Sequence, residues 1–195
     1  MYKHPAKLSL SAALLAACMA LPLTAALSWH AGSAAAAETG SGVEHGVKAA
    51  FLYKFLGYVE FPNQPEASAP YVVGVSGAED IAAELNRIAV GRNVNGHAVV
   101  VRVLREGDPV SGLQLLFIAG PESPRTAPML RAAQQANVLT VTEGPNSLQA
   151  GSVINFRLVD DRIRFEVSLE AAEKSNLKLS SRLLSVAYAV QKGGS

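Results

Sequence analysis

The residues that could do chemistry in this chain are few and scattered. Two histidines, His45 and His97, follow residue 37, and neither lies in a motif with a serine or cysteine that it could activate as a nucleophile. Their wide separation, with no second His or Cys at metal-ligand spacing, also argues against a zinc site. The sequence therefore predicts no catalytic residue and no metal site, and it favours structural or surface roles for both histidines.

One strand-to-helix junction has two of the three glycines that a phosphate-binding fingerprint would need. It reads GVSG, with Gly74 and Gly77 at its ends. A dinucleotide fingerprint requires three glycines, and Ser76 occupies the second glycine position here. Glu79 and Asp80 then open the next helix, where the helix dipole favours carboxylates but a phosphate would be repelled by them. We therefore expect an ordinary acidic first turn and no nucleotide cofactor.

A predicted hairpin in the last third of the chain carries an unusual pair of cations. Residues 152–159 and 162–168 alternate apolar and polar side chains, and Asp160-Asp161 lies between them as a two-residue turn. A two-residue turn fixes which residues face each other across the strands. The expected pairs are Phe156 with Phe165, Arg157 with Arg164, and Asn155 with Glu166.

Like charges that face each other directly are mildly destabilising in a sheet. An acidic group is therefore expected near Arg157 and Arg164. Glu166, or a carboxylate from a helix, could supply it within the chain. The alternative is an acidic patch on a protein partner or a small anionic ligand. In that case Arg157, Arg164 and Glu166 form part of a recognition surface.

An aromatic helix must lie at the start of the domain. The segment 47–62, VKAAFLYKFLGYVEFP, holds five of the twelve aromatic residues in the chain. Its apolar residues recur at helical spacing, and Pro62 cannot continue a helix, so the helix is predicted to end near Glu60. Most of this face is expected in the core. The apolar stripe is wide enough that Tyr53 or Tyr58 could instead contact a partner or a second copy.

Strands alternate with helices through the middle of the chain. Continuous apolar strands without in–out alternation are buried on both faces. The sequence therefore predicts a single compact α/β domain, with a central mixed sheet flanked by helices on both faces and the antiparallel hairpin at its edge or end. The predicted strands are 71–75, 98–104, 113–119 and 138–142; the predicted helices are 78–88, 129–135, 169–176 and 182–191, the last capped by Ser180 or Ser181.

Residues 1–37 have the layout of a secretory signal peptide. Two lysines near the start precede a long apolar run, and a small-residue segment that ends at Ala37 offers a cleavage site. A retained membrane anchor and a lipoprotein with Cys18 as its lipidated N-terminus are the alternatives. With cleavage, residues 38–46 form a short lead-in and residues 47–191 form the domain, which would reside in the periplasm.

The composition after Ala37 excludes some classes of function. Sixteen acidic and fifteen basic residues follow it, so this part of the chain lacks the basic stripe that nucleic-acid binding requires. The only cysteine is Cys18, and the domain can therefore form no disulfide and no thiolate metal site. The 158 residues after Ala37 are enough to bury a core. That core must hold the fold without covalent cross-links.

Both ends of the predicted domain resemble one known family. The segment 47–62 and the segment 154–187, INFRLVDDRIRFEVSLEAAEKSNLKLSSRLLSVA, are similar to the YfiR (YfiR/HmsC-like) family of exported bacterial regulators. The intervening VNGHAVVVRVL, LQLLFIA and NVLTVTE follow the order that this family shows. The resemblance covers about residues 43–191.

The resemblance implies a compact periplasmic α/β domain, often dimeric, that has no catalytic centre and needs no cofactor. The best-known members restrain a membrane-bound diguanylate cyclase by contacting its periplasmic sensor region, which lowers cyclic-di-GMP output and biofilm formation. This chain departs from those members in two ways. It lacks their cysteine pairs, so disulfide-based control is not available, and Phe61 stands where many members have Trp, so its subgroup stays open.

Three functions therefore remain in view. The principal one is a non-enzymatic regulator that binds an inner-membrane receptor, most simply a diguanylate cyclase, and forms a homodimer. A periplasmic small-ligand-binding domain feeding a sensor or transporter would need a deep pocket with convergent polar groups. A hydrolase would need a Ser or Asp close to one of the histidines. The predicted partner-binding residues are Tyr53, Tyr58, Arg157, Arg164 and Glu166.

Overall fold

The computed structural model describes residues 31–193 apart from residue 63, with side chains from residue 41 onward. Most of the predicted signal peptide, including Cys18, lies outside the described residues. The chain divides into two compact units, residues 1–39 and 40–195, and the second contains all of the described strands. The elements are α1 (Ala31–Phe55), β1 (Val59–Glu60), β2 (Tyr71–Ser76), α2 (Glu79–Ala89), β3 (Asn93–Val94), β4 (His97–Val103), β5 (Leu115–Ile118), α3 (Thr126–Gln135), β6 (Leu139–Thr142), β7 (Ile154–Val159), β8 (Arg162–Ser168), α4 (Leu169–Lys174), β9 (Lys178–Leu179), α5 (Ser181–Val186) and β10 (Ala189–Gln191).

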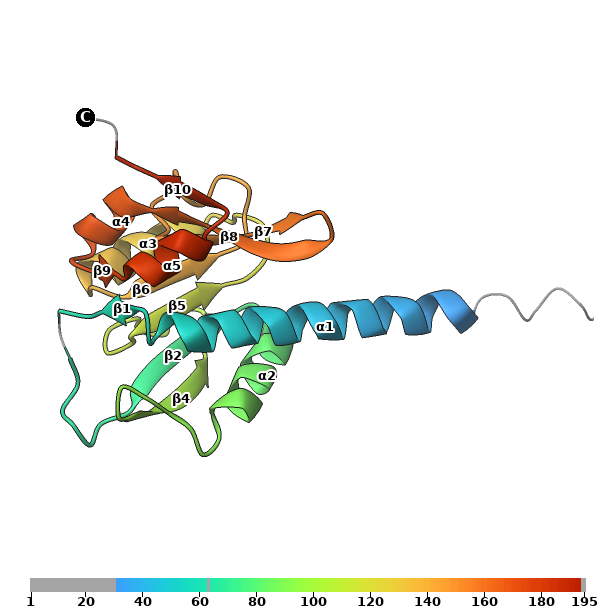
Figure 1. Cartoon of the computed structure of the whole chain (residues 1–195), viewed down its shortest axis with the longest axis horizontal. Helices are drawn as coiled ribbons and strands as arrows, with labels where there is room; N and C mark the ends of the chain where they lie inside the picture. Colours follow the sequence, from blue (N-terminus) through green and yellow to red (C-terminus); the bar gives the residue numbers. More distant parts are fainter. Residues whose placement is uncertain (1–30, 63, 194–195) are drawn as a thin grey trace, which may run out of the picture. The chain divides into compact units, whose positions relative to one another are not determined.

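An eight-stranded mixed sheet forms the centre of the second unit, in the order β10-β8-β7-β6-β5-β2-β4-β3 (Figure 1). The strands β4, β2, β5, β6 and β7 run parallel, whereas β3 and β8 are antiparallel to their inner neighbours. The chain places β4 on one side of β2 and then adds β5, β6 and β7 on the other. This is a doubly wound arrangement, and its direction reverses between β2 and β5.

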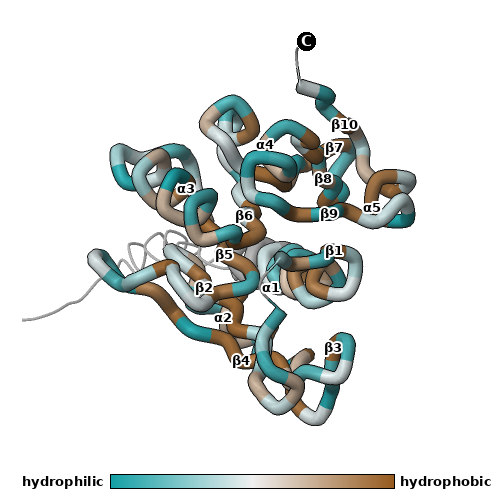
Figure 2. Tube along the Cα trace, turned by 90° about the vertical axis from the view of Figure 1, so that its left-hand side faces the viewer, coloured by the Kyte–Doolittle hydropathy of each residue, from teal (hydrophilic) through white to brown (hydrophobic). Residues whose placement is uncertain are grey.

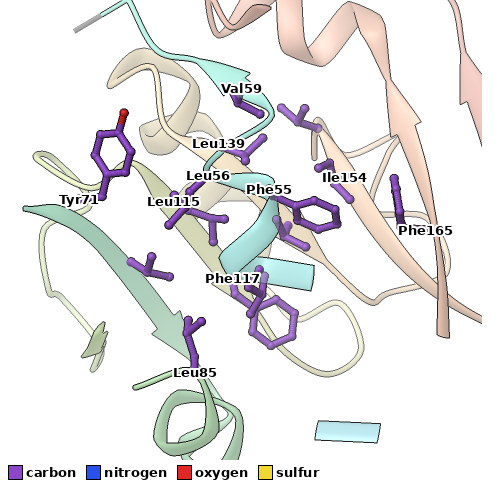
Figure 3. Close-up of a cluster of buried hydrophobic side chains, with 14 of the residues drawn as sticks. Phe55, Leu56, Val59, Tyr71, Leu85, Leu115, Phe117, Leu139, Ile154 and Phe165 are labelled. Carbon is purple, nitrogen blue, oxygen red and sulfur yellow. The ribbon is translucent and has the colours of Figure 1, made fainter. Parts of the chain in front are cut away.

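Apolar side chains cover both faces of this sheet, as the uninterrupted apolar strands predicted. The larger cluster joins α1, α2, α4 and α5 to one face. There Phe55 of α1 and Leu56, the residue after it, lie close to Leu115 and Phe117 of β5 (Figure 3). The smaller cluster packs α3 against the other face. Figure 2 shows hydrophobic colour along β5 and β6, in the middle of the sheet. The predicted α/β class with helices on both faces is confirmed.

Four phenylalanines, which we call the aromatic quartet, join α1 to the β7–β8 hairpin. Phe51 and Phe55 lie one helical turn apart, with ring centroids separated by 5.8 Å. Each also contacts Phe156 of β7 and Phe165 of β8, at centroid distances between 5.0 and 6.1 Å. Aromatic pairs at such distances add to the free energy gained from burial alone. The first helix and the hairpin are therefore held as one body.

The first helix ends five residues earlier than predicted. It stops at Phe55, because the amides of Gly57 and Tyr58 bond back to the carbonyls of Lys54 and Phe55 in a tight turn. The next residues form β1, which pairs with β9 in a separate two-stranded sheet. A short apolar run does not distinguish a last helical turn from a buried strand. At its other end α1 begins at Ala31, so the predicted lead-in, 38–46, is helical.

The last predicted helix, 182–191, is correct only in its first half. Ser180 caps α5 by accepting a hydrogen bond from the amide of Leu183, as predicted, but the helix ends at Val186. Tyr188 then donates its amide to the carbonyl of Phe165, and the chain continues as β10 alongside β8. The hairpin is therefore one strand in from the edge of the sheet.

Replacing Phe55 by alanine should lower the free energy of unfolding by about 3–5 kcal/mol, because it removes a buried ring of the quartet and leaves a cavity. Equilibrium urea unfolding, followed by circular dichroism, measures this. Val90→Ala is the matched control, since Val90 is exposed and its loss should change stability by less than about 0.5 kcal/mol. Equal effects of the two substitutions would contradict the central place of the quartet.

Candidate functional site

The hairpin has the register that its sequence predicted. Phe156 faces Phe165, Arg157 faces Arg164, and Asn155 faces Glu166. Asp160 and Asp161 form its turn, with φ values of 48° and 56°. Two successive residues with positive φ are the mark of a type I′ turn, whose twist matches that of the flanking strands. The two-residue loop therefore sets the facing arginines.

The two arginines lack an acidic partner in the described part of the chain. Both are exposed, and neither Glu166 nor a helix carboxylate lies within ion-pair distance of either one. Arg157 makes one long hydrogen bond, 3.5 Å from Nη1 to the carbonyl of Pro145. The sequence left two alternatives for the acidic group near these arginines, one within the chain and one on a partner. Among the described residues, no acidic group of the chain itself pairs with either arginine.

The two predicted tyrosines lie apart from the hairpin. Tyr53 is half-buried on α1, and its hydroxyl donates to the carbonyl of Asn93 in β3, at the opposite end of the sheet from β8. Tyr58 is half-buried in the turn after α1 and packs against the larger core cluster. The five predicted contact residues therefore do not form one continuous patch.

A cavity of about 420 Å³ opens between α1 and the hairpin, beside the carboxyl ends of β5 and β6. Open α/β sheets bind ligands at such carboxyl ends, close to the point where the strand order reverses. The walls of the cavity are largely apolar, and the polar groups in them come from α1, from two loops and from β7. The lining residues are Glu44, Lys48, Gly120, Pro121, Glu143, Pro145, Phe156, Arg157, Leu158 and Ile163.

A partly buried ion cluster forms part of the cavity lining. Nζ of Lys48 lies 2.6 Å from Oε2 of Glu143 and 2.5 Å from Oε1 of Glu44. The other carboxylate oxygen of Glu143 accepts a hydrogen bond of 2.6 Å from the amide of Gly120. Only 10% of the Lys48 side chain is exposed. The cluster therefore ties α1 to the loops that follow β5 and β6.

The environment of Lys48 keeps it charged. Burial lowers its pKa, but hydrogen bonds and charge attraction from Glu143 and Glu44 outweigh this, and the pKa of Lys48 lies above its ordinary value. A lysine that holds its proton this firmly, with Nζ committed to two carboxylates, is not available as a general base or nucleophile. Its role in the cavity is structural and electrostatic.

Sequence reasoning missed this cluster. No role is predicted from the sequence for either Lys48 or Glu143. Two local signals were present: a lysine directly beside the apolar stripe, and a carboxylate immediately after the carboxyl end of a buried strand. Neither signal indicates that residues 95 positions apart form a hydrogen bond.

The contacts of His97 are with an aromatic ring and a backbone carbonyl. His97 is buried, stacks on Tyr71 at a centroid distance of 4.6 Å, and places Nδ1 2.7 Å from the carbonyl of Ala69. In the described part of the chain, neither His97 nor His45 is hydrogen-bonded to a serine or an aspartate. The same residues contain no group of three or more His, Cys, Asp or Glu placed to hold a metal ion.

A family model described as YfiR/HmsC-like matches residues 45–188, which include the aromatic quartet, Lys48, Glu143 and the hairpin. The chain belongs to the YfiR/HmsC-like family. This family is known for periplasmic regulators rather than catalysts. No curated protein matches the chain significantly. Within residues 31–193, no helix of this family member is long and apolar enough to cross a membrane.

Replacing Lys48 by methionine should destabilise this YfiR/HmsC-like domain by about 2 kcal/mol at pH 7, because two carboxylates lose a charged donor. The folded-state pKa of Lys48 is raised above 10.5, so its stabilisation is fully present below pH 10.5 and is lost as the pH rises further. The difference in unfolding free energy between the two proteins should stay constant from pH 7 to 10.

Urea unfolding between pH 7 and 11 measures this difference. Lys54→Met is the matched control, because Lys54 is exposed in the last turn of the same helix. A difference that vanished by pH 9, or an equal effect at Lys54, would show that the ammonium group of Lys48 is not the source of the stabilisation.

Proposed function

We propose that this protein is a periplasmic regulator that binds a membrane-bound signalling protein and restrains it. The partner is most simply the periplasmic sensor region of a diguanylate cyclase, so that binding lowers cyclic-di-GMP output. The observation that carries the proposal is the family match over residues 45–188. Export through residues 1–37 and assembly as a homodimer belong to the same proposal.

The hairpin is the best candidate for the contact surface. Arg157 and Arg164 stand together on one face without an acidic partner in the described residues, and Leu158 on the other face is 64% exposed. Uncompensated cations beside an exposed leucine favour a partner with carboxylates next to an apolar patch. Charge complementarity of this kind fixes the orientation of a complex and accelerates its formation.

Restraint of a receptor requires only differential binding. The regulator must prefer the inactive conformation, and a shift from 1% to 99% inactive requires about 10⁴-fold tighter binding to that state. A rigid contact surface loses little conformational entropy when it binds. The aromatic quartet supplies such rigidity, because it fixes the base of the hairpin to α1.

Binding of a small ligand is the second candidate, and the 420 Å³ cavity supports it. Leu158 and Ile163 of the hairpin line this cavity, so a bound molecule would touch the same hairpin that carries the arginines. A small ligand could therefore modulate the contact with the receptor. The two candidates share Arg157 and Leu158, which line the cavity and also belong to the proposed contact surface, so a bound ligand would alter the surface that the receptor meets.

A substitution at the facing arginines allows the effect on folding stability to be distinguished from the effect on receptor binding. Replacing Arg157 by glutamate places opposite charges across the strands, so the free energy of unfolding should rise by about 0.5 kcal/mol. The same change should weaken receptor binding at least about ten-fold, because an acidic partner surface is now repelled. Urea unfolding gives the stability, and biolayer interferometry with the purified sensor region gives the affinity.

Arg182→Glu is the matched control, since Arg182 is exposed on α5, away from the hairpin turn, and its reversal should leave binding unchanged. A gain in stability with loss of binding cannot come from misfolding. If charge reversal at Arg157 and Arg164 together leaves both fold and binding intact, the hairpin is not the contact surface.

A further inference from the structure

The outer edge of β4 is open over most of its length. β3 pairs only with the first two residues, His97 and Ala98. From Val99 to Val103, the described part of the chain places β2 on the inner side of β4 and no strand on the outer side. We call this stretch the β4 edge. The other edge strand of the sheet, β10, has only three residues.

The backbone of the β4 edge presents hydrogen-bonding groups to the outside. The amide of Leu104 donates to the carbonyl of Val75 in β2, at 2.8 Å. Backbone groups of alternate residues point to opposite sides of a strand. The amide and carbonyl groups of Val99, Val101 and Val103 therefore point away from β2. They form a regular row of donors and acceptors at the spacing that an added strand requires.

The β4 edge has one of the features that usually prevent edge-to-edge pairing, the charged side chain of Arg102, and lacks the others. Natural edge strands are protected by charged side chains, above all lysine, or by proline, a bulge or short length. This edge contains neither lysine nor proline, and it stays in regular register with β2 over five residue pairs. Val100 and Val103 are 44% and 46% exposed, and β4 is mainly hydrophobic in Figure 2. The backbone of this edge is therefore accessible to an added strand.

The charges beside the β4 edge indicate which kind of strand would pair with it. Arg102 is exposed and forms no ion pair within the described residues. The same is true of Arg92, which directly precedes β3. Arg105 has a local carboxylate, because its amide bonds to Asp108. If two copies paired antiparallel about Val101, the two Arg102 side chains would lie diagonally on one face, an unfavourable arrangement. An acidic strand is favoured over a second copy.

We propose that the β4 edge binds an extended acidic segment of a partner protein as a ninth strand of the sheet. Ladder hydrogen bonds to Val99, Val101 and Val103 provide affinity, and a carboxylate facing Arg102 provides specificity. Three strands, β6, β5 and β2, separate this edge from the hairpin. The surface is therefore independent of the receptor contact proposed above, and the protein can hold two different polypeptides at once.

A fluorescein-labelled peptide, Gly-Ser-Thr-Val-Glu-Val-Thr-Ser-Gly, tests this proposal when it is titrated with the purified full-length chain and followed by fluorescence anisotropy at low salt. We expect saturable binding that falls at least ten-fold when alternate peptide amides are N-methylated, because the ladder loses its donors. A peptide with Lys in place of Glu should bind about ten-fold more weakly. Amide NMR shifts should be centred on Val99–Val103.

Charge exchange provides the decisive comparison. Arg102→Glu should weaken binding of the Glu peptide about ten-fold and strengthen binding of the Lys peptide, a reversal that misfolding cannot produce. Arg131→Glu, at an exposed position on α3, should change neither affinity. The proposal is overturned if the peptide does not bind at 1 mM, if N-methylation does not change its affinity, or if Arg102→Glu leaves the preference for the Glu peptide over the Lys peptide unchanged. It is also overturned if the NMR shifts are confined to the hairpin or β10, or if the protein dimerises through the β4 edge.

Discussion

The packing of Phe51 and Phe55 against Phe156 and Phe165 is the constraint on which the rest of this structure depends. It joins the first helix of the domain to the hairpin of its last third, across the face of the central sheet. The same contact sets the separation between α1 and the hairpin, and hence the walls of the cavity. Together with the pairing of β7 with β6 and of β8 with β10, it fixes the position of the arginine pair relative to the core.

A second, polar tie acts beside the first. The Lys48 cluster joins α1 to the loops after β5 and β6, so the helix is fixed by apolar contacts along one stripe and by charge next to it. Burial of a charged lysine carries a desolvation cost, and two carboxylates offset it. Such a cluster tolerates little displacement of the helix. The cluster therefore fixes the distance between the helix and the sheet, and with it the shape of the cavity.

Local patterns predicted the middle of this chain well, and long-range contacts explain where they did not. Uninterrupted apolar runs identified the buried parallel strands β2, β5 and β6, whereas the run 98–104, also predicted as buried, is the partly exposed strand β4 near the edge of the sheet. Asp160-Asp161 was sufficient to fix the pairing of the hairpin arginines. The early end of α1 at Phe55 depends on a partner strand more than one hundred residues away, and β10 depends on the free side of β8. The Lys48–Glu143 pair is likewise a product of the fold. Contact roles for Tyr53, Tyr58, Arg157, Arg164 and Glu166 stay predictions.

The pairing of β1 with β9 forms a two-stranded sheet from the first and last parts of the domain, so neither part can form it alone. A chain synthesised from its N-terminus exposes the aromatic face of its first helix for as long as the hairpin and β9 have not been made. Folding must then close loops of more than one hundred residues, which is slow, and no cysteine is present in the domain to trap a partly folded state. Until synthesis is complete, the nascent chain therefore carries an exposed aromatic helix, which is a surface prone to aggregation.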